Sequence, residues 1–255
     1  MKTLKFVVCL LAAATYFSPH LVAQDDDMTQ AFWVHEDRVY PKMAAEYESV
    51  SKELVDLAQE HEVEGSWIAM RTEDYRYISL SPIANMADLD KRPFAKIAEK
   101  MGKENFGKVF DRFDACYDNH GSYILVLDKE LSYQPTGINT TPAGKDYRAI
   151  TYYHFKAADT DNARDLAMKF KKLYTDKGSE LHYRVYRSGF GVMGQFYMVA
   201  VAAESAEAYE KMQTENRMKL GAEGAQLFGE LQEMMLKVEY VRGTMLPDQG
   251  YSSSN

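Results

Sequence analysis

The sequence predicts an α+β fold made of two tandem copies of one βαββαβ unit. Strand-like apolar runs and long helical patterns follow one another in the same order in residues 31–128 and 148–246. Gly102 and Gly221 interrupt the second helical pattern of each half, 119 residues apart (221 − 102). The stretch between the halves, 129–147, is polar and rich in Pro, Gly and Thr, as expected of a linker.

The first half opens with a short alternating strand, AFWVHED, which begins at residue 31. A helical pattern covers residues 42–61, and two strand-like runs, GSWIAMRT and YRYISLSP, follow with two acidic residues between them. A second, interrupted helix is predicted over 86–117. SYILVLD, rich in β-branched and aromatic residues, closes the half as a strand.

The second half repeats this order. RAITYYHF is predicted as a strand, and the helix after it has Asp161 as N-cap and Gly178 as C-cap. LHYRVYRS and GQFYMVAVAA are strands around a glycine-bearing turn, a helix follows over 205–235, and KVEYVRGTML is the last strand. His35 and His154 end the first strand of their half, also 119 residues apart, which supports a duplication.

The N-terminus is typical of a secretory signal peptide over residues 1–23. Lys2 and Lys5 precede the apolar run FVVCLLAAATY, which is too short to span a bilayer, and cleavage is predicted before Gln24. We therefore expect an exported protein, periplasmic or secreted, without stable membrane insertion after cleavage; an N-terminal anchor is the alternative. Residues 24–30 form an acidic lead and 247–255 a disordered tail.

Composition limits the partners and the chemistry. The net charge of −8 argues against nucleic-acid binding. Cleavage would leave Cys116 as the single cysteine, which excludes an intramolecular disulfide. No HExxH, CxxC or P-loop is present, and the GFGVMG turn leads into a strand, unlike a dinucleotide fingerprint. The run His35-Glu36-Asp37 is not expected to chelate a metal, because adjacent strand residues point to opposite faces. No metal and no cofactor are predicted.

A βαββαβ unit has helices on one face of its sheet, so its other apolar face must also be buried. Two units can press these faces together or close their sheets into a barrel. With this element order the sequence resembles the ferredoxin-like dimeric α/β-barrel superfamily, which includes antibiotic-biosynthesis monooxygenases, haem-degrading monooxygenases, muconolactone-isomerase-like and stress-responsive barrel proteins. The resemblance implies an intramolecular version of that barrel. It spans nearly the whole mature chain and depends on no diagnostic motif.

Candidate site residues follow from a choice of strand face. We place Phe32, Val34, Ile68 and Met70 toward the helices, and the alternate positions toward the barrel interior. His35 and His154 then become candidate catalytic residues. The candidate ligand-binding residues on the same faces are Trp33, Trp67, Arg71, Tyr152, Tyr183 and Arg187. In the second half, Arg184 and Tyr186 alternate with the chosen face.

Histidines, arginines and aromatic rings can together bind an apolar, aromatic or anionic small molecule between the repeats. The resemblance implies a cofactor-independent monooxygenase-like or isomerase-like activity. The alternatives are a non-catalytic envelope or stress protein, an interaction module that uses the acidic outer helices, and a haem-binding barrel; a homo-oligomer is compatible with each. A cavity of several hundred Å³ lined by these residues favours binding, and a solid interior favours the structural role.

Overall fold

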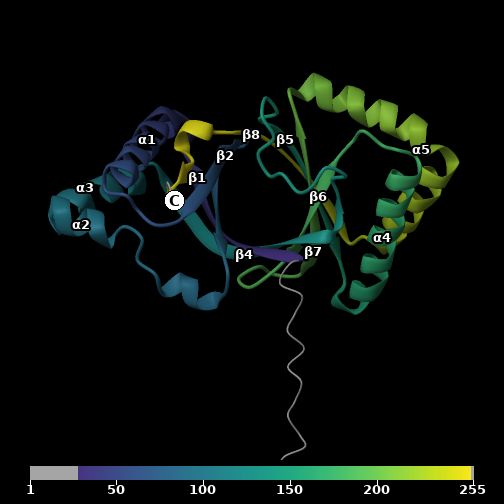
Figure 1. Ribbon diagram of the computed structural model, residues 1–255, viewed down its shortest axis with the longest axis horizontal. Helices are drawn as coiled ribbons and strands as arrows, with labels where there is room; N and C mark the ends of the chain where they lie inside the picture. The colour runs from purple at the N-terminus through teal and green to yellow at the C-terminus, as the bar shows by residue number, and fades with distance from the viewer. Residues whose placement is uncertain (1–27, 254–255) are drawn as a thin grey trace, which may run out of the picture.

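The computed structural model describes residues 28–253. Eight strands close into an antiparallel barrel, with one group of helices on each of two opposite outer sides (Figure 1). Around the barrel the strand order is β3-β1-β4-β6-β7-β5-β8-β2, and a β2–β3 pairing closes the circle. The predicted fold class is confirmed.

The first half contains four barrel strands and three helices. Strand β1 pairs with β3 and β4 and therefore lies between two strands of its own half. Gly102, with φ 82°, separates the two shorter helices and confirms the predicted interruption. The elements are β1 (Thr29–Val39), α1 (Ala44–Glu60), β2 (Ser66–Thr72), β3 (Arg76–Ile83), α2 (Ala95–Met101), α3 (Lys103–Asp114) and β4 (Tyr117–Tyr133).

The second half repeats the order with β5 (Tyr147–Phe155), α4 (Thr160–Asp176), β6 (Tyr183–Ser188), β7 (Gln195–Ala203), α5 (Ala206–Met234) and β8 (Lys237–Met245). Gly221, with φ 58°, breaks the helical geometry inside α5. Helices α1 and α4 each have 17 residues and begin at residues 44 and 160, so the halves are 116 residues out of phase at this point. At that offset His35 corresponds to Thr151, and the predicted His35–His154 match is wrong.

Two seams join the halves into one barrel. At the first seam β4 pairs with β6, and at the second seam β8 pairs with β2. The second seam is tight: a Cβ atom on Gly243 would lie 2.5 Å from the carbonyl oxygen of Arg71. Each half therefore completes the sheet of the other, because neither four-stranded sheet could bury its inner apolar face alone.

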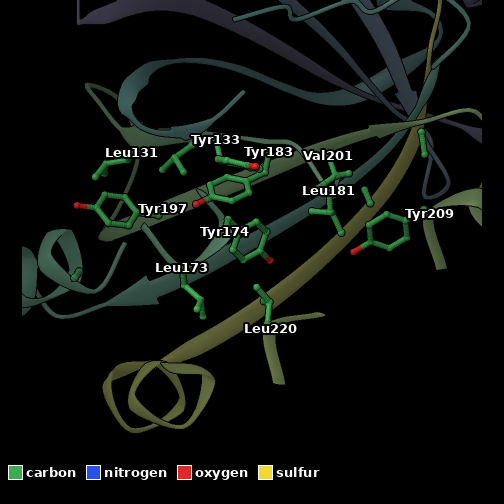
Figure 2. Close-up of a cluster of buried hydrophobic side chains, with 14 of the residues drawn as sticks. Leu131, Tyr133, Leu173, Tyr174, Leu181, Tyr183, Tyr197, Val201, Tyr209 and Leu220 are labelled. Atoms are coloured by element: carbon green, nitrogen blue, oxygen red, sulfur yellow. The ribbon is translucent and has the colours of Figure 1, made fainter. Parts of the chain in front are cut away.

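The apolar side chains form three cores. The barrel core fills the interior and takes residues from both halves, including Phe32, Val34, Met70, Ile150 and Met198. A second core lies between the first-half strands and α1–α3. A third lies between the second-half strands and α4 and α5, and Figure 2 shows its concentration of tyrosine rings. Most strands are thus buried on both faces.

The linker is shorter than predicted. Strand β4 runs on to Tyr133, five residues into the predicted 129–147 segment. Leu131 is completely buried and Tyr133 nearly so, both in the core beneath α4 and α5. Strand β4 therefore packs beneath the helices of both halves. The polar residues around Leu131 and Tyr133 in the sequence do not indicate this.

The predicted disordered tail is ordered over residues 247–253. After a 3-10 turn, β9 (Tyr251–Ser252) pairs with β2. Tyr251 is 7% exposed, and its hydroxyl donates to the Val63 carbonyl oxygen at 2.6 Å. This buried contact anchors the tail. The polar sequence YSSSN gives no indication of it.

The predicted signal peptide, its cleavage site and most of the acidic lead lie outside the described residues. Within residues 28–253, none of the helices combines the length and apolarity needed to cross a bilayer.

Candidate functional site: the barrel interior

The side chains that line the barrel interior are not the set expected from the sequence. Phe32, Val34, Ile68 and Met70 point inward, where we expected their neighbours. The face prediction is therefore wrong for β1 and β2, and the position of Tyr186 in the barrel core shows that it is wrong for β6 as well. The physical reason is that both faces of these strands lie under apolar layers, so no polar face marks the outside.

In the first half, the four predicted site residues lie on the helix side of the sheet. Trp33 is partly exposed, and its ring centroid lies 5.9 Å from that of His35. The Trp67 indole donates to the Gln249 carbonyl oxygen at 2.8 Å and so helps to hold the C-terminal tail. The Arg71 guanidinium donates to Glu48 on α1 at 2.8 Å.

In the second half the outcome is divided. Tyr183 lies in the core beneath α4 and α5, and Arg187 forms an ion pair with Asp128 at 3.1 Å. Tyr152 and His154 do face the interior, where both rings contact Phe196. The predicted catalytic pair is therefore split, since His35 and His154 lie on opposite faces of the barrel wall.

Two arginines that the sequence analysis did not select form the most polar part of the interior. Arg148 on β5 and Arg184 on β6 are each 2% exposed. Arg148 donates to the backbone carbonyl oxygens of Thr140 at 3.0 Å and of Lys145, both in the linker, and to that of Tyr147 at 3.1 Å. Arg184 donates from Nη1 to the Asn139 carbonyl oxygen at 2.6 Å, while its Nε is buried without a hydrogen-bond partner.

These two guanidinium groups lack acidic partners. Among residues 28–253, the recorded ion pairs give neither group a carboxylate oxygen within 4.0 Å. Burial, and then the charge of Arg184, lower the pKa of Arg148 to about 10, although Asp146 opposes the shift. Two buried like charges that form no direct ion pair with a carboxylate cost several kcal/mol. Such a cost is typical of a site that is completed by an anion.

The opposite end of the interior has a different polar group of residues. The Tyr123 hydroxyl donates to Glu36 at 3.4 Å, and Arg76 lies 4.0 Å from the same carboxylate. Burial raises the pKa of Tyr152 to about 12. The Nε2 atom of His154 is buried without a partner, and burial together with Lys237 lowers the pKa of this imidazole.

The space between these ends is small. A cavity of about 40 Å³ remains, lined by both arginines, Tyr123, Tyr152 and apolar side chains of the barrel core. Ile138 of the linker and Val192 of the β6–β7 hairpin both pack against that core. A larger hollow of about 420 Å³ is an open groove between α4 and the end of α5, and its lining is largely acidic. The described interior thus holds only a few water molecules' worth of space, far below a typical ligand site.

A sequence signal for the arginines exists. Arg148 begins the alternation Arg148-Ile150-Tyr152, and Arg184 is two residues before Tyr186. A charged residue in register with buried apolar neighbours is expensive and marks a functional position more sharply than an arginine at a strand end.

The comparisons with known proteins concern the fold. No family model matches the chain, and no curated protein matches it. Three solved structures are similar. An anthrone oxidase-like protein has a TM-score of 0.60 at 13% identity, over 89% of this chain and 94% of its own. A monooxygenase-like protein from Lactobacillus acidophilus has a TM-score of 0.52 at 8% identity, over 89% and 97%. A second one, from Fusobacterium nucleatum, has a TM-score of 0.53 at 11% identity, over 86% and 93%.

Identities this low report architecture and not activity. Each match covers nearly all of the compared structure, so both halves of this protein take part in it. The chain therefore has the ferredoxin-like dimeric α/β-barrel fold, with both units of the barrel supplied by one polypeptide.

Proposed function

We propose that the barrel binds a small anionic ligand with an aromatic or apolar body, and that Arg148 and Arg184 recognise its carboxylate or phosphate. The observation that carries the proposal is a pair of buried guanidinium groups that form no ion pair with any carboxylate of residues 28–253. The planar guanidinium fork matches the oxygens of a carboxylate or phosphate and forms short, charge-assisted hydrogen bonds with them.

In the ligand-free chain, backbone carbonyl groups occupy this position. The carbonyl oxygens of Asn139 and Thr140 accept hydrogen bonds from the two arginines. The neighbouring Ile138 packs against the barrel core. These neutral acceptors are weaker partners for a cation than an anion would be. An entering anion would displace them, and the outward movement of residues 138–140 would enlarge the cavity toward ligand size.

The rest of the interior suits an apolar or aromatic body. Met70, Met198 and Met245 line the cavity beside Tyr186 and Ile150. Methionine side chains have several rotatable bonds and a polarisable sulfur, so they can rearrange around a ring more easily than branched side chains. The interior is thus filled with adaptable groups at the place where a ligand would enter.

Titration with small anions tests the proposal. We expect benzoate, phenyl phosphate or inorganic phosphate to raise the melting temperature, since a ligand at 100 times its Kd stabilises a protein by about 2.7 kcal/mol. Benzamide, which has the shape of benzoate without the charge, should have little effect. Arg184→Met should abolish the response, and Arg187→Met should keep it, because Arg187 lies on the opposite face of β6.

No response to any of the three anions, or an equal response in Arg184→Met, would reject anion binding. It would favour the second candidate, a non-catalytic structural barrel, which the 40 Å³ cavity supports. An activity of the monooxygenase or isomerase type stays a proposal. Tyr152 and His154, at the other end of the same interior, are the groups that could exchange a proton with a bound ligand.

The haem alternative does not fit the barrel interior. His35 lies outside the barrel, and the interior cavity of about 40 Å³, which His154 does not line, is much smaller than a porphyrin. We also propose that the protein is exported, on the strength of the charged and apolar pattern of residues 1–23. Gln24 as the first residue of protein recovered from the periplasm or medium is the expected result, and a retained Met1 would contradict it. Homo-oligomer formation stays a prediction.

A further inference from the structure

A second group of polar residues lies outside the barrel, on the helix side of the first half. His35 and Asp37 are two residues apart on β1, so their side chains share one face. In the β1–β4 register, Asp37 is directly opposite His120. One nitrogen from each histidine and one carboxylate oxygen of Asp37 lie within 4.8 Å of one another.

Asp37 is the buried member of this group. Its side chain is 5% exposed, and its Oδ2 accepts a hydrogen bond from the Tyr47 hydroxyl at 2.6 Å. The other oxygen, Oδ1, is buried and accepts no well-directed hydrogen bond, although His35 Nε2 lies 3.1 Å away and His120 Nδ1 lies 3.9 Å away. An unpartnered carboxylate oxygen thus points toward two imidazoles.

The surroundings orient the imidazoles. The Nδ1 atom of His35 is 2.9 Å from the Ser122 hydroxyl, which leaves Nε2 to face Asp37. The His120 ring packs against Tyr117, with 5.2 Å between ring centroids. Outer contacts of this kind hold metal-ligating histidines and carboxylates in place.

We infer that His35, Asp37 and His120 form a binding site for a divalent transition-metal ion of the zinc class. Two imidazole nitrogens and one carboxylate are a common donor set for such ions. Ligand bonds of about 2.0–2.2 Å place two donor atoms about 3.4 Å apart in a tetrahedral site. The His35–Asp37 pair is already that close, and His120, whose side chain is 55% exposed, can swing inward by the missing distance.

The site would keep at least one coordination position for water or a small ligand, because three protein ligands leave zinc incomplete. Asp37 closes the buried side, and the partly exposed histidines leave the other side open to solvent. The prediction of no metal from the sequence considered only adjacent residues. It overlooked that residues i and i + 2 of a strand share a face.

The second half provides an internal comparison. At the 116-residue offset of the first strands, His35 and Asp37 correspond to Thr151 and Tyr153, and the residue opposite Tyr153 is Val238. None of these three is a good zinc ligand. The duplication therefore supplies the same scaffold twice, with a donor set in one copy.

Calorimetric titration of the metal-free full chain with Zn²⁺ tests the inference. We expect one ion per chain with a Kd of about 1 μM or tighter. His120→Ala, an exposed position whose loss should leave the fold intact, should weaken binding by at least about 100-fold. Tyr47→Phe removes the hydrogen bond to Asp37 and should weaken binding by about 10–100-fold. His61→Ala, at the end of α1 and outside the group, should bind as the wild type does.

Co²⁺ in place of Zn²⁺ adds a spectroscopic readout. Visible absorption bands from cobalt in an ordered ligand field should appear in the wild type and in His61→Ala, and should be lost in His120→Ala. Equal Zn²⁺ affinity in wild type and His120→Ala would overturn the assignment, as would a wild-type Kd no tighter than that of His120→Ala for Co²⁺. The arginine pair takes no part in this site, so the result is independent of anion binding.

Discussion

Replacement of Arg184 by methionine should leave the stability of the protein almost unchanged. Methionine keeps the apolar stem of the side chain inside the barrel and removes a charge that forms no ion pair within residues 28–253. Most substitutions of a buried arginine are destabilising, because they leave a buried carboxylate unpaired. Here the same substitution should cost almost no stability.

The structure sets the size of the effect. Burial and, to a smaller extent, Arg184 lower the pKa of Arg148 to about 10, which corresponds to about 3 kcal/mol of unfavourable free energy at neutral pH. Arg184→Met removes part of that cost and the desolvation of its own charge. It also removes one charged hydrogen bond to Asn139, worth about 1.5–3 kcal/mol. These gains and losses nearly cancel, so the expected change in the free energy of unfolding is at most about 1 kcal/mol.

Urea denaturation at pH 7 measures this change, with the melting temperature as a second readout at about 2–4 °C for each kcal/mol. Arg187→Met on the same strand is the matched control. It removes an ion pair with Asp128, which is 2% exposed and keeps Arg164 at 3.2 Å, so it should lose about 1–2 kcal/mol. If Arg184→Met loses as much stability as Arg187→Met, the arginine pair is not an uncompensated charge and the reasoning fails.

Substitutions at three further positions, Gly243, Tyr251 and His154, test other parts of the structure. Gly243→Ala should lose about 1–3 kcal/mol in urea denaturation, because its Cβ would collide with the Arg71 carbonyl at the β8–β2 seam; Gly121→Ala, with open space around it, should be nearly neutral. Tyr251→Ala should lose about 3–5 kcal/mol and Tyr251→Phe about 1–3 kcal/mol, because the phenylalanine keeps the ring and leaves only the Val63 carbonyl unpaired; a Tyr251→Phe variant as stable as the wild type would contradict the role of that hydrogen bond. The lowered pKa of His154 means that the unfolded chain takes up this proton first, so stability present above about pH 6.5 should be lost as the pH falls below it. His154→Asn should flatten that part of the curve between pH 7.5 and 5, and an unchanged slope would show that this imidazole does not titrate differently on unfolding.

The sequence was sufficient for the architecture and insufficient for the site. Element order, the helix breaks at Gly102 and Gly221 and the closure of two units into a barrel were all predictable, because periodicity and glycine positions report local backbone structure. The tail was not, since contacts with residues far away along the chain hold it, including the hydrogen bond of the buried Tyr251. That contact depends on Val63, which is 188 residues away along the chain.

The sequence did not show which face of each strand points into the barrel. An alternating pattern identifies a face only where one side of the strand is apolar and the other is polar. On β1, Phe32 faces the barrel core and Trp33 the outer side, and both letters are aromatic. The polar residues within these apolar strands were the informative positions. Arg148 and Arg184 stand in register with buried apolar residues, and His35 and Asp37 share a face with Trp33.

Joining the two halves by residues 134–146 frees the barrel from a constraint that a dimer of identical chains must obey. In such a dimer every side chain occurs twice around the central axis, so a charged residue in the interior is always repeated. Here the positions that correspond to Arg148 and Arg184 at the 116-residue offset are Phe32 and Ile68. One polypeptide can therefore hold two arginines where a symmetric pair would have four or none. Each copy of the unit has become free to acquire its own chemistry without imposing it on the other.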